Sequence, residues 1–112
     1  MLQQTASPSR RFNSRIDTSG GVWVYWRCDE NDETARVRDV SLGGLFVETA
    51  KPRAVGSTAK VDFLVQEGPI RADAVVRQVE RGCGLGLKLT AVSDGDRPHF
   101  IALLNRLRSA SR

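Results

Sequence analysis

Hydrophobic and polar residues alternate in short runs along most of this chain, which is the period of half-buried β-strands. Clusters of glycine, proline and small or acidic polar residues separate these runs at intervals of roughly ten residues. The pattern predicts six strands, over residues 22–28, 34–40, 45–49, 60–65, 70–80 and 84–89. Short, evenly spaced strands with turn signals between them are typical of an antiparallel β-barrel.

The first of these strands carries two tryptophans of opposite parity, Trp23 and Trp26. Because successive side chains of a strand point to opposite faces, we expect one of them in the core and the other at the surface. A surface tryptophan would be free to stack on a base or to contact a partner protein. The polar stretch at 29–32 (Asp-Glu-Asn-Asp) is predicted to form a four-residue hairpin loop.

The alternation is less regular further along the chain. Strict alternation in the second strand places Ala35, Val37 and Asp39 on one face. The fourth strand alternates poorly. The fifth changes phase near residues 75–77, which predicts a β-bulge at that point.

Near the C-terminus the hydrophobic period changes from two residues to a helical one. The spacing i, i+3, i+4 and i+7 relates Phe100, Leu103, Leu104 and Leu107. Residues so spaced lie on one face of a helix, which is predicted over about 96–108. We expect this face to cover an open side of the barrel, burying apolar surface that the strands leave uncovered.

Length and composition indicate one small domain. With 112 residues, 40% of them hydrophobic, the chain suffices for one core and is too short for two. We expect a flexible arm at 1–9, a folded domain at 10–108 and a tail at 109–112. No apolar run is long enough to span a membrane, and the N-terminus lacks the pattern of a secretory signal. A cytoplasmic location is therefore expected.

Two cysteines and one histidine limit the chemistry that the chain can perform. Cys28, Cys83 and His99 lack the spacing of a standard zinc site, so no metal is expected. Reduced thiols are expected, with a disulfide possible only if the two cysteines are neighbours. No nucleophile motif or carboxylate cluster accompanies His99, so no catalytic residue and no enzyme activity are predicted.

Arginine dominates the positive charge, with 14 arginines against 3 lysines and a net charge of +4. The planar guanidinium fork suits phosphate groups and guanine edges, although a high-GC genome would also enrich arginine. Position is more informative. Arg10, Arg11 and Arg15 form an R-R-x-x-x-R segment in an acid-free arm, and residues 39–44 read D-V-S-L-G-G. The R-x-x-x-R spacing occurs three times in the chain, so only its combination with the second segment is informative.

Together the two segments hold a partner for each polar edge of a guanine nucleotide. An arginine fork meets the guanine O6 and N7 acceptors, and the Asp39 carboxylate is able to accept from N1–H and N2–H. Ser41 and backbone N–H groups would bind phosphate, while Gly43 and Gly44 permit positive φ and close backbone approach. A solvated basic arm and a purely structural turn are the alternative interpretations of the same residues.

The order and spacing of the two segments resemble the signature motifs of PilZ domains, which are bacterial receptors for the second messenger cyclic di-GMP. A glycine-rich run at 82–87 also resembles the late glycine-rich strand of that family, and the resemblance covers residues 10 to about 108. It implies a six-stranded barrel followed by a helix.

Carried over to this chain, the resemblance assigns roles to individual residues. Arg11 and Arg15 would clamp cyclic di-GMP, Asp39 would read a guanine, and Ser41 would bind phosphate or backbone. Glycines in the same turn, Gly43 and Gly44, would allow the ligand to approach. The glycine-rich run adds Gly84 and Leu85 as further ligand-binding candidates.

Arg10 is an additional guanidinium just before the motif, able to contact a second ligand, so an intercalated cyclic di-GMP dimer is predicted. Ligand binding is expected to order residues 1–15 over the barrel and to change the surface offered to a partner protein. Two alternatives stay open. One is a basic barrel that binds single-stranded nucleic acid, although Asp39 would repel a phosphate backbone. The other is a PilZ-fold interaction module without ligand.

Overall fold

The computed structural model describes residues 14–18, 21–51 and 53–110. The described chain is a closed six-stranded antiparallel β-barrel with one C-terminal helix, which confirms the predicted fold class. The elements are β1 (Ile16–Asp17), β2 (Trp23–Cys28), β3 (Asn31–Ser41), β4 (Gly44–Glu48), β5 (Thr58–Leu64), β6 (Ile70–Glu80), β7 (Gly84–Val92), the 3₁₀ turn η1 (Asp94–Asp96) and α2 (Arg97–Ala110).

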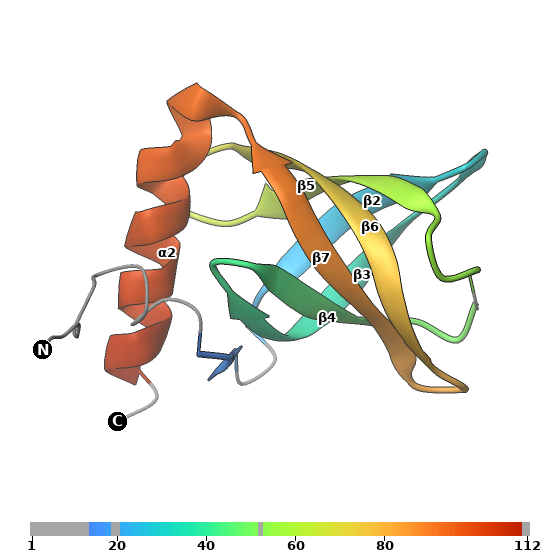
Figure 1. The fold of residues 1–112 in the computed structure, drawn as a ribbon. Helices are drawn as coiled ribbons and strands as arrows, with labels where there is room; N and C mark the ends of the chain where they lie inside the picture. The colour runs from blue at the N-terminus through green and yellow to red at the C-terminus, as the bar shows by residue number, and fades with distance from the viewer. Residues whose placement is uncertain (1–13, 19–20, 52, 111–112) are drawn as a thin grey trace, which may run out of the picture.

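The barrel closes because β3 pairs on both of its sides. The ring runs β3–β2–β5–β6–β7–β4, and pairing between β4 and β3 completes it. The short β1 is a seventh strand that the sequence did not predict; it pairs with β3 beyond the end of β2. In Figure 1 the helix α2 stands against one end of the barrel, and the β2–β3 and β6–β7 hairpins reach toward the other end.

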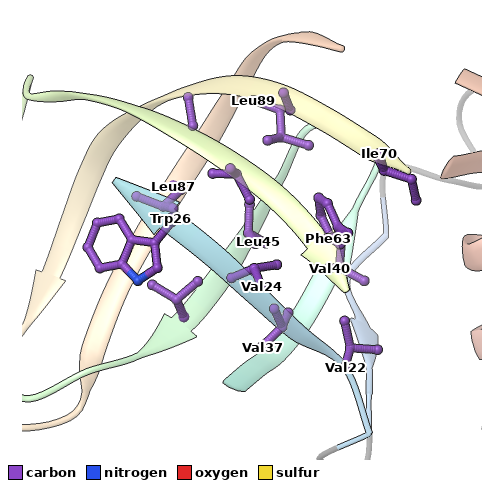
Figure 2. Packing of buried hydrophobic residues seen from close by; sticks show 14 of the residues in the cluster. Val22, Val24, Trp26, Val37, Val40, Leu45, Phe63, Ile70, Leu87 and Leu89 are labelled. Carbon is purple, nitrogen blue, oxygen red and sulfur yellow. The ribbon is translucent and has the colours of Figure 1, made fainter. Parts of the chain in front are cut away.

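The core lies inside the barrel and is built by alternation within each strand. Figure 2 shows aliphatic side chains such as Val24 and Leu45 converging there from different strands. Trp26 is 1% exposed whereas Trp23 is 41% exposed, so the prediction of one buried and one surface tryptophan is confirmed. The expectation of poor alternation in the fourth predicted strand is wrong, because every second residue of β5 is buried, beginning at Ala59.

The C-terminal helix begins within one residue of the predicted start and extends two residues past the predicted end, into the expected tail. Its buried residues are the four predicted ones, Phe100, Leu103, Leu104 and Leu107. The ring of Phe100 packs against Phe63 of β5 with centroids 5.6 Å apart. The apolar face therefore covers the end of the barrel where Phe63 and Ile70 lie (Figures 1 and 2).

Charged contacts fasten this helix to the β5–β6 region. The Arg71 backbone N–H and Nε donate to Asp96 Oδ2 at 3.0 and 2.8 Å, and Nη2 donates to Oδ1 at 3.2 Å. These hydrogen bonds lower the pKa of Asp96 and raise the pKa of Arg71. Arg106 likewise donates from Nε and Nη2 to both oxygens of Glu67, which lowers the pKa of Glu67.

Two local expectations are decided by the strand registers. The β2–β3 hairpin turns through two residues, Asp29 and Glu30, and not four, because Cys28 already pairs with Asn31. Asp29 adopts a φ of 59°, which aspartate tolerates better than most residues. The bulge predicted near 75–77 is confirmed, with a register shift between Val76 and Gln78 and a second one at Asp73/Ala74.

The two cysteines are both free thiols in different environments. Cys28 is buried on β2, where burial raises its pKa, and Cys83 is exposed in the turn between β6 and β7. The open possibility of a disulfide is therefore not realised, since Cys28 pairs with Asn31 and Ala59 instead.

Candidate ligand-binding face

A bulge in β3 sets the orientation of the second motif. Val37 and Val40 are both fully buried although they are three residues apart, which strict alternation forbids. The register accounts for this, since Val37 pairs with Val47 and Asp39 with Phe46, so that Arg38 is the extra residue. The predicted face of Asp39 is therefore wrong. The bulge turns its carboxylate outward, away from the core that Val37 enters.

Thr18 holds the bulge from the neighbouring strand. Its backbone N–H donates to the Arg38 carbonyl at 3.1 Å, and its hydroxyl donates to the Val37 carbonyl. Thr18 is buried, so these bonds satisfy carbonyl groups that the disrupted ladder would leave unpaired. On the same edge of β3, Asp17 pairs with Asp39. The segment following the first motif is thus built into the sheet beside the second.

The two motifs meet through Arg15 and Asp39, which are 24 residues apart in the sequence. Arg15 Nη1 donates to Asp39 Oδ1 at 2.7 Å, with both side chains partly open to solvent. The structure thus brings one predicted ligand-binding residue of each motif together. The expected ordering of residues 1–15 on ligand binding stays a prediction. Arg10 and Arg11 lie outside the described residues.

The turn after Asp39 is held by its own serine. The Gly43 N–H donates to Ser41 Oγ at 3.3 Å, and Ser41 is only 4% exposed. A Cβ atom on Gly44 would lie 2.4 Å from the Leu87 carbonyl oxygen, so β7 packs too closely for any other residue. Neither Gly43 nor Gly44 adopts positive φ, which corrects that part of the prediction. Their direct role in the structure is to bring β3, β4 and β7 together.

The register places the outward residues of four strands in rows across the barrel. One row runs Asp39, Phe46, Gly86, Gln78 over β3, β4, β7 and β6. Of the two further candidates, Gly84 lies beneath the Phe46 ring, where a Cβ atom would approach Phe46 Cε1 to 2.6 Å. Leu85 is buried in the core. Gly84 is therefore covered by Phe46, and the Leu85 side chain points away from this face.

Arg38 and Phe46 belong to this face, although the sequence analysis did not select them. Phe46 is 4% exposed yet is absent from the buried core cluster, because it packs on the outside of the barrel. The Arg38 guanidinium carbon lies 3.7 Å from the Phe46 ring centroid. Arg38 Nε is 3.4 Å from Asp39 Oδ2, and Nη1 is 3.6 Å from Glu80 Oε1. Phe46 points outward because Leu45 and Val47, its neighbours in β4, point into the core. Its contact with Arg38 comes from strand pairing across the bulge and has no local pattern in the sequence.

Lys88 is a second addition to the face. It pairs with Gly44, next to the motif turn, and its side chain is exposed. Among the described residues no carboxylate forms an ion pair with it. Its parity in β7, shared with Gly84 and Gly86, was a signal in the sequence that could have placed it on the outer face.

Comparison with protein families assigns the fold. The family model of the PilZ domain matches residues 9–106, most of the chain. The chain belongs to the PilZ domain family. PilZ domains are known as cyclic di-GMP receptor domains, and the family is a ligand-binding one and not a catalytic one. A comparison with curated proteins found no significant match. Within the described residues, no helix has the length and apolar character needed to cross a membrane.

The charge on this face of the PilZ domain is balanced among the described residues. Arg15, Arg38 and Lys88 are the cations close to the motif turn. Three carboxylates, those of Asp17, Asp39 and Glu80, lie among them. A dianionic ligand gains little attraction from a balanced surface. The described cations alone therefore give this face little excess positive charge.

Proposed function

We propose that this protein is a cyclic di-GMP receptor that passes the signal to a partner protein. The observation that carries the proposal is the contact between Arg15 and Asp39, which joins the two motifs on one outer face of the barrel. A guanidinium and a carboxylate side by side supply the donor and the acceptor that the two edges of guanine require. Family membership supports the same ligand.

Within this proposal Arg11 and Arg15 clamp the phosphates and one guanine edge, and Asp39 accepts from guanine N1–H and N2–H. Each carboxylate oxygen has two acceptor sites, so Asp39 is able to bind guanine while still accepting from Arg15. Ser41 and Gly43 shape the turn, and the exposed Gly43 lies where backbone can approach phosphate.

Arg10 extends the proposal to stoichiometry. As an additional guanidinium beside the clamp, it would contact a second cyclic di-GMP intercalated with the first. Ligand binding would draw the segment that carries Arg10 and Arg11 onto the barrel, neutralising its charge and changing the surface that a partner meets. Output through a partner, and a cytoplasmic location, stay predictions of this proposal.

Isothermal titration with cyclic di-GMP tests the receptor function. We expect micromolar or tighter binding to the wild type, weakened about 10- to 100-fold by Arg11→Ala, Arg15→Ala or Asp39→Ala, since hydrogen bonds to charged groups contribute about 1.5–3 kcal/mol each. The matched control is Arg77→Ala, in the R-x-x-x-R pair at 77/81 that has no D-x-S-x-x-G partner. It should leave affinity within about twofold.

The outcomes separate the competing functions. Two ligands per protein in the wild type and one in Arg10→Ala would support the dimer, whereas a wild-type ratio of one contradicts it. Failure of the wild type to bind, together with tight and salt-sensitive binding of single-stranded DNA, would favour the nucleic-acid barrel. Failure to bind either ligand would favour an interaction module that uses the PilZ fold alone.

A further inference from the structure

We propose that Arg38, which lies over the Phe46 ring, is a stacking subsite for one guanine base of the ligand. The inference rests on the proposed receptor function and adds to it a residue outside both signature motif patterns. It begins from an aromatic ring in an unusual position, because Phe46 is buried on the outside of the barrel and not in its core.

Three layers build the subsite outward from the barrel wall. The first is the backbone of β7 at Gly84, whose missing Cβ makes room for the Phe46 ring. Phe46 is the second layer. The third is the Arg38 guanidinium, 3.7 Å from the ring centroid, which is the separation of a stacked cation–π contact. The ring covers the guanidinium from one side, so a base would approach it from the outward side.

The contacts of Arg38 fix its position and leave that outward side open. Nε lies 3.4 Å from Asp39 Oδ2, and Nη1 lies 3.6 Å from Glu80 Oε1. Both polar contacts are therefore made by the nitrogen atoms at the edge of the guanidinium group. The Arg38 side chain is 46% exposed despite these contacts. A guanidinium held at its edge and covered on one face is a preorganised platform for a second planar group.

The neighbouring carboxylate indicates which planar group fits best. Bases stack on arginine guanidinium planes as they do on aromatic rings. A base lying on Arg38 is next to Asp39, whose carboxylate accepts hydrogen bonds and donates none at neutral pH. Guanine offers two adjacent donors on its N1/N2 edge, whereas adenine offers an acceptor at N1 and a donor at N6. The pair therefore selects guanine over adenine.

The experiment compares titrations of cyclic di-GMP and cyclic di-AMP into five proteins: wild type, Arg15→Ala, Arg38→Ala, Arg38→Lys and Arg36→Ala. Arg36 is the matched control, because it lies on the same strand, is exposed and stacks on a different aromatic ring, that of Trp23, at 5.3 Å. Base stacking contributes about 1–3 kcal/mol, so Arg38→Ala should weaken cyclic di-GMP binding by about 5- to 150-fold.

Lysine separates stacking from charge. Arg38→Lys keeps the positive charge beside Asp39 and Glu80 but has no plane, so we expect it to bind nearly as weakly as Arg38→Ala. Arg36→Ala should stay within about twofold of the wild type. All variants should melt within a few degrees of the wild type, because the altered side chains are exposed.

Each result has a distinct meaning. Wild-type affinity in Arg38→Lys would overturn the stacking subsite and leave a role for charge alone. Wild-type affinity in Arg38→Ala, with binding still weakened in Arg15→Ala, would overturn any role of Arg38 while keeping the receptor function. Equal affinity of the wild type for cyclic di-AMP would overturn the selection by Asp39. Absence of binding to the wild type would overturn the proposed function itself.

Discussion

The helix end of the barrel and the motif face both join arginine to carboxylate groups, but the two sets of contacts differ in depth and geometry. At the helix end, Asp96 and Glu67 are less than a tenth exposed, and each receives hydrogen bonds on both oxygens from one arginine. At the motif face, Arg15 and Arg38 are about half exposed, and the contacts of Arg38 are long.

The difference shows how one type of residue pair serves two purposes. A buried carboxylate bonded on both oxygens is costly to separate, so such pairs fix α2 on the barrel. An exposed contact through one nitrogen contributes little to stability and exchanges readily with another partner. The contacts of the motif face therefore position its guanidinium groups but can be exchanged for contacts with a ligand. This suits a surface that binds a charged ligand.

The largest expected effect on stability comes from breaking a helix-end pair. Arg106→Ala leaves the Glu67 carboxylate nearly buried without its partner, and we expect the free energy of unfolding to fall by about 1–3 kcal/mol. For a domain of this size the melting temperature should drop by about 5–15 °C. Thermal unfolding followed by circular dichroism measures the change.

Arg15→Ala is the counterpart at the motif face. Exposed ion pairs contribute about 0–1 kcal/mol, so its melting temperature should stay within a few degrees of the wild type. Should Arg15→Ala destabilise the fold as strongly as Arg106→Ala, the distinction between fixed and exchangeable pairs would be lost.

A smaller effect is expected at the bulge of β3, where fold and site meet. Thr18→Val keeps the shape of the side chain but removes the hydroxyl that donates to the Val37 carbonyl. A lost buried hydrogen bond costs about 1–2 kcal/mol. Because the bulge orients Asp39, this variant should also weaken cyclic di-GMP binding. Arg106→Ala should not weaken binding when it is assayed at a temperature at which it is folded. Thr18→Ser restores the hydroxyl and should recover most of both properties.

This bulge also marks the limit of what the sequence could predict. Six strands and one helix followed from local periodicity. Each of these elements buries one face, so its apolar residues recur with the period of a strand or a helix. Asp39 was assigned to the wrong face because strict alternation allows for no extra residue, and the bulge inserts Arg38 between Val37 and Asp39. The hydroxyl that stabilises the bulge comes from Thr18, a partner distant in sequence.

The residues of the candidate site that belong to sequence motifs could be predicted. The residue that joins the site through packing between strands could not. Arg15 and Asp39 were selected from the combination of the two motifs and their resemblance to a known family, and the barrel brings them together. Arg38 was passed over because its importance comes from Phe46, a residue of another strand whose ring packs over Gly84. Such a stack is a property of four strands, and no window of the sequence contains it.

Acid should loosen the helix end. The pKa values of Asp96 and Glu67 are lowered by hydrogen bonds from Arg71 and Arg106. A carboxyl group whose pKa is lower in the folded state stabilises the fold above its unfolded pKa, which is about 4. That stability is lost as the pH falls through the folded values.

Melting curves at several pH values test this expectation. The melting temperature should change little between about pH 7 and pH 5 and fall progressively below about pH 4. Glu67→Gln cannot titrate, so it should start lower than the wild type and lose less stability on acidification. Parallel pH profiles for the two proteins would show that the Glu67 contact with Arg106 does not contribute.

The smallest expected effect concerns Lys88, the cation on the motif face that has no carboxylate partner among the described residues. Beside the turn at Gly44, its ammonium group is placed to attract phosphate at long range without a fixed geometry. Lys88→Ala should therefore weaken cyclic di-GMP binding by only about two- to fivefold, and raising the salt concentration should reduce the difference. Lys60→Ala removes another exposed lysine, one that is paired with Asp73, and should leave affinity unchanged. Equal effects of the two substitutions would mean that net charge, and not the position of Lys88, governs attraction of the ligand to this face.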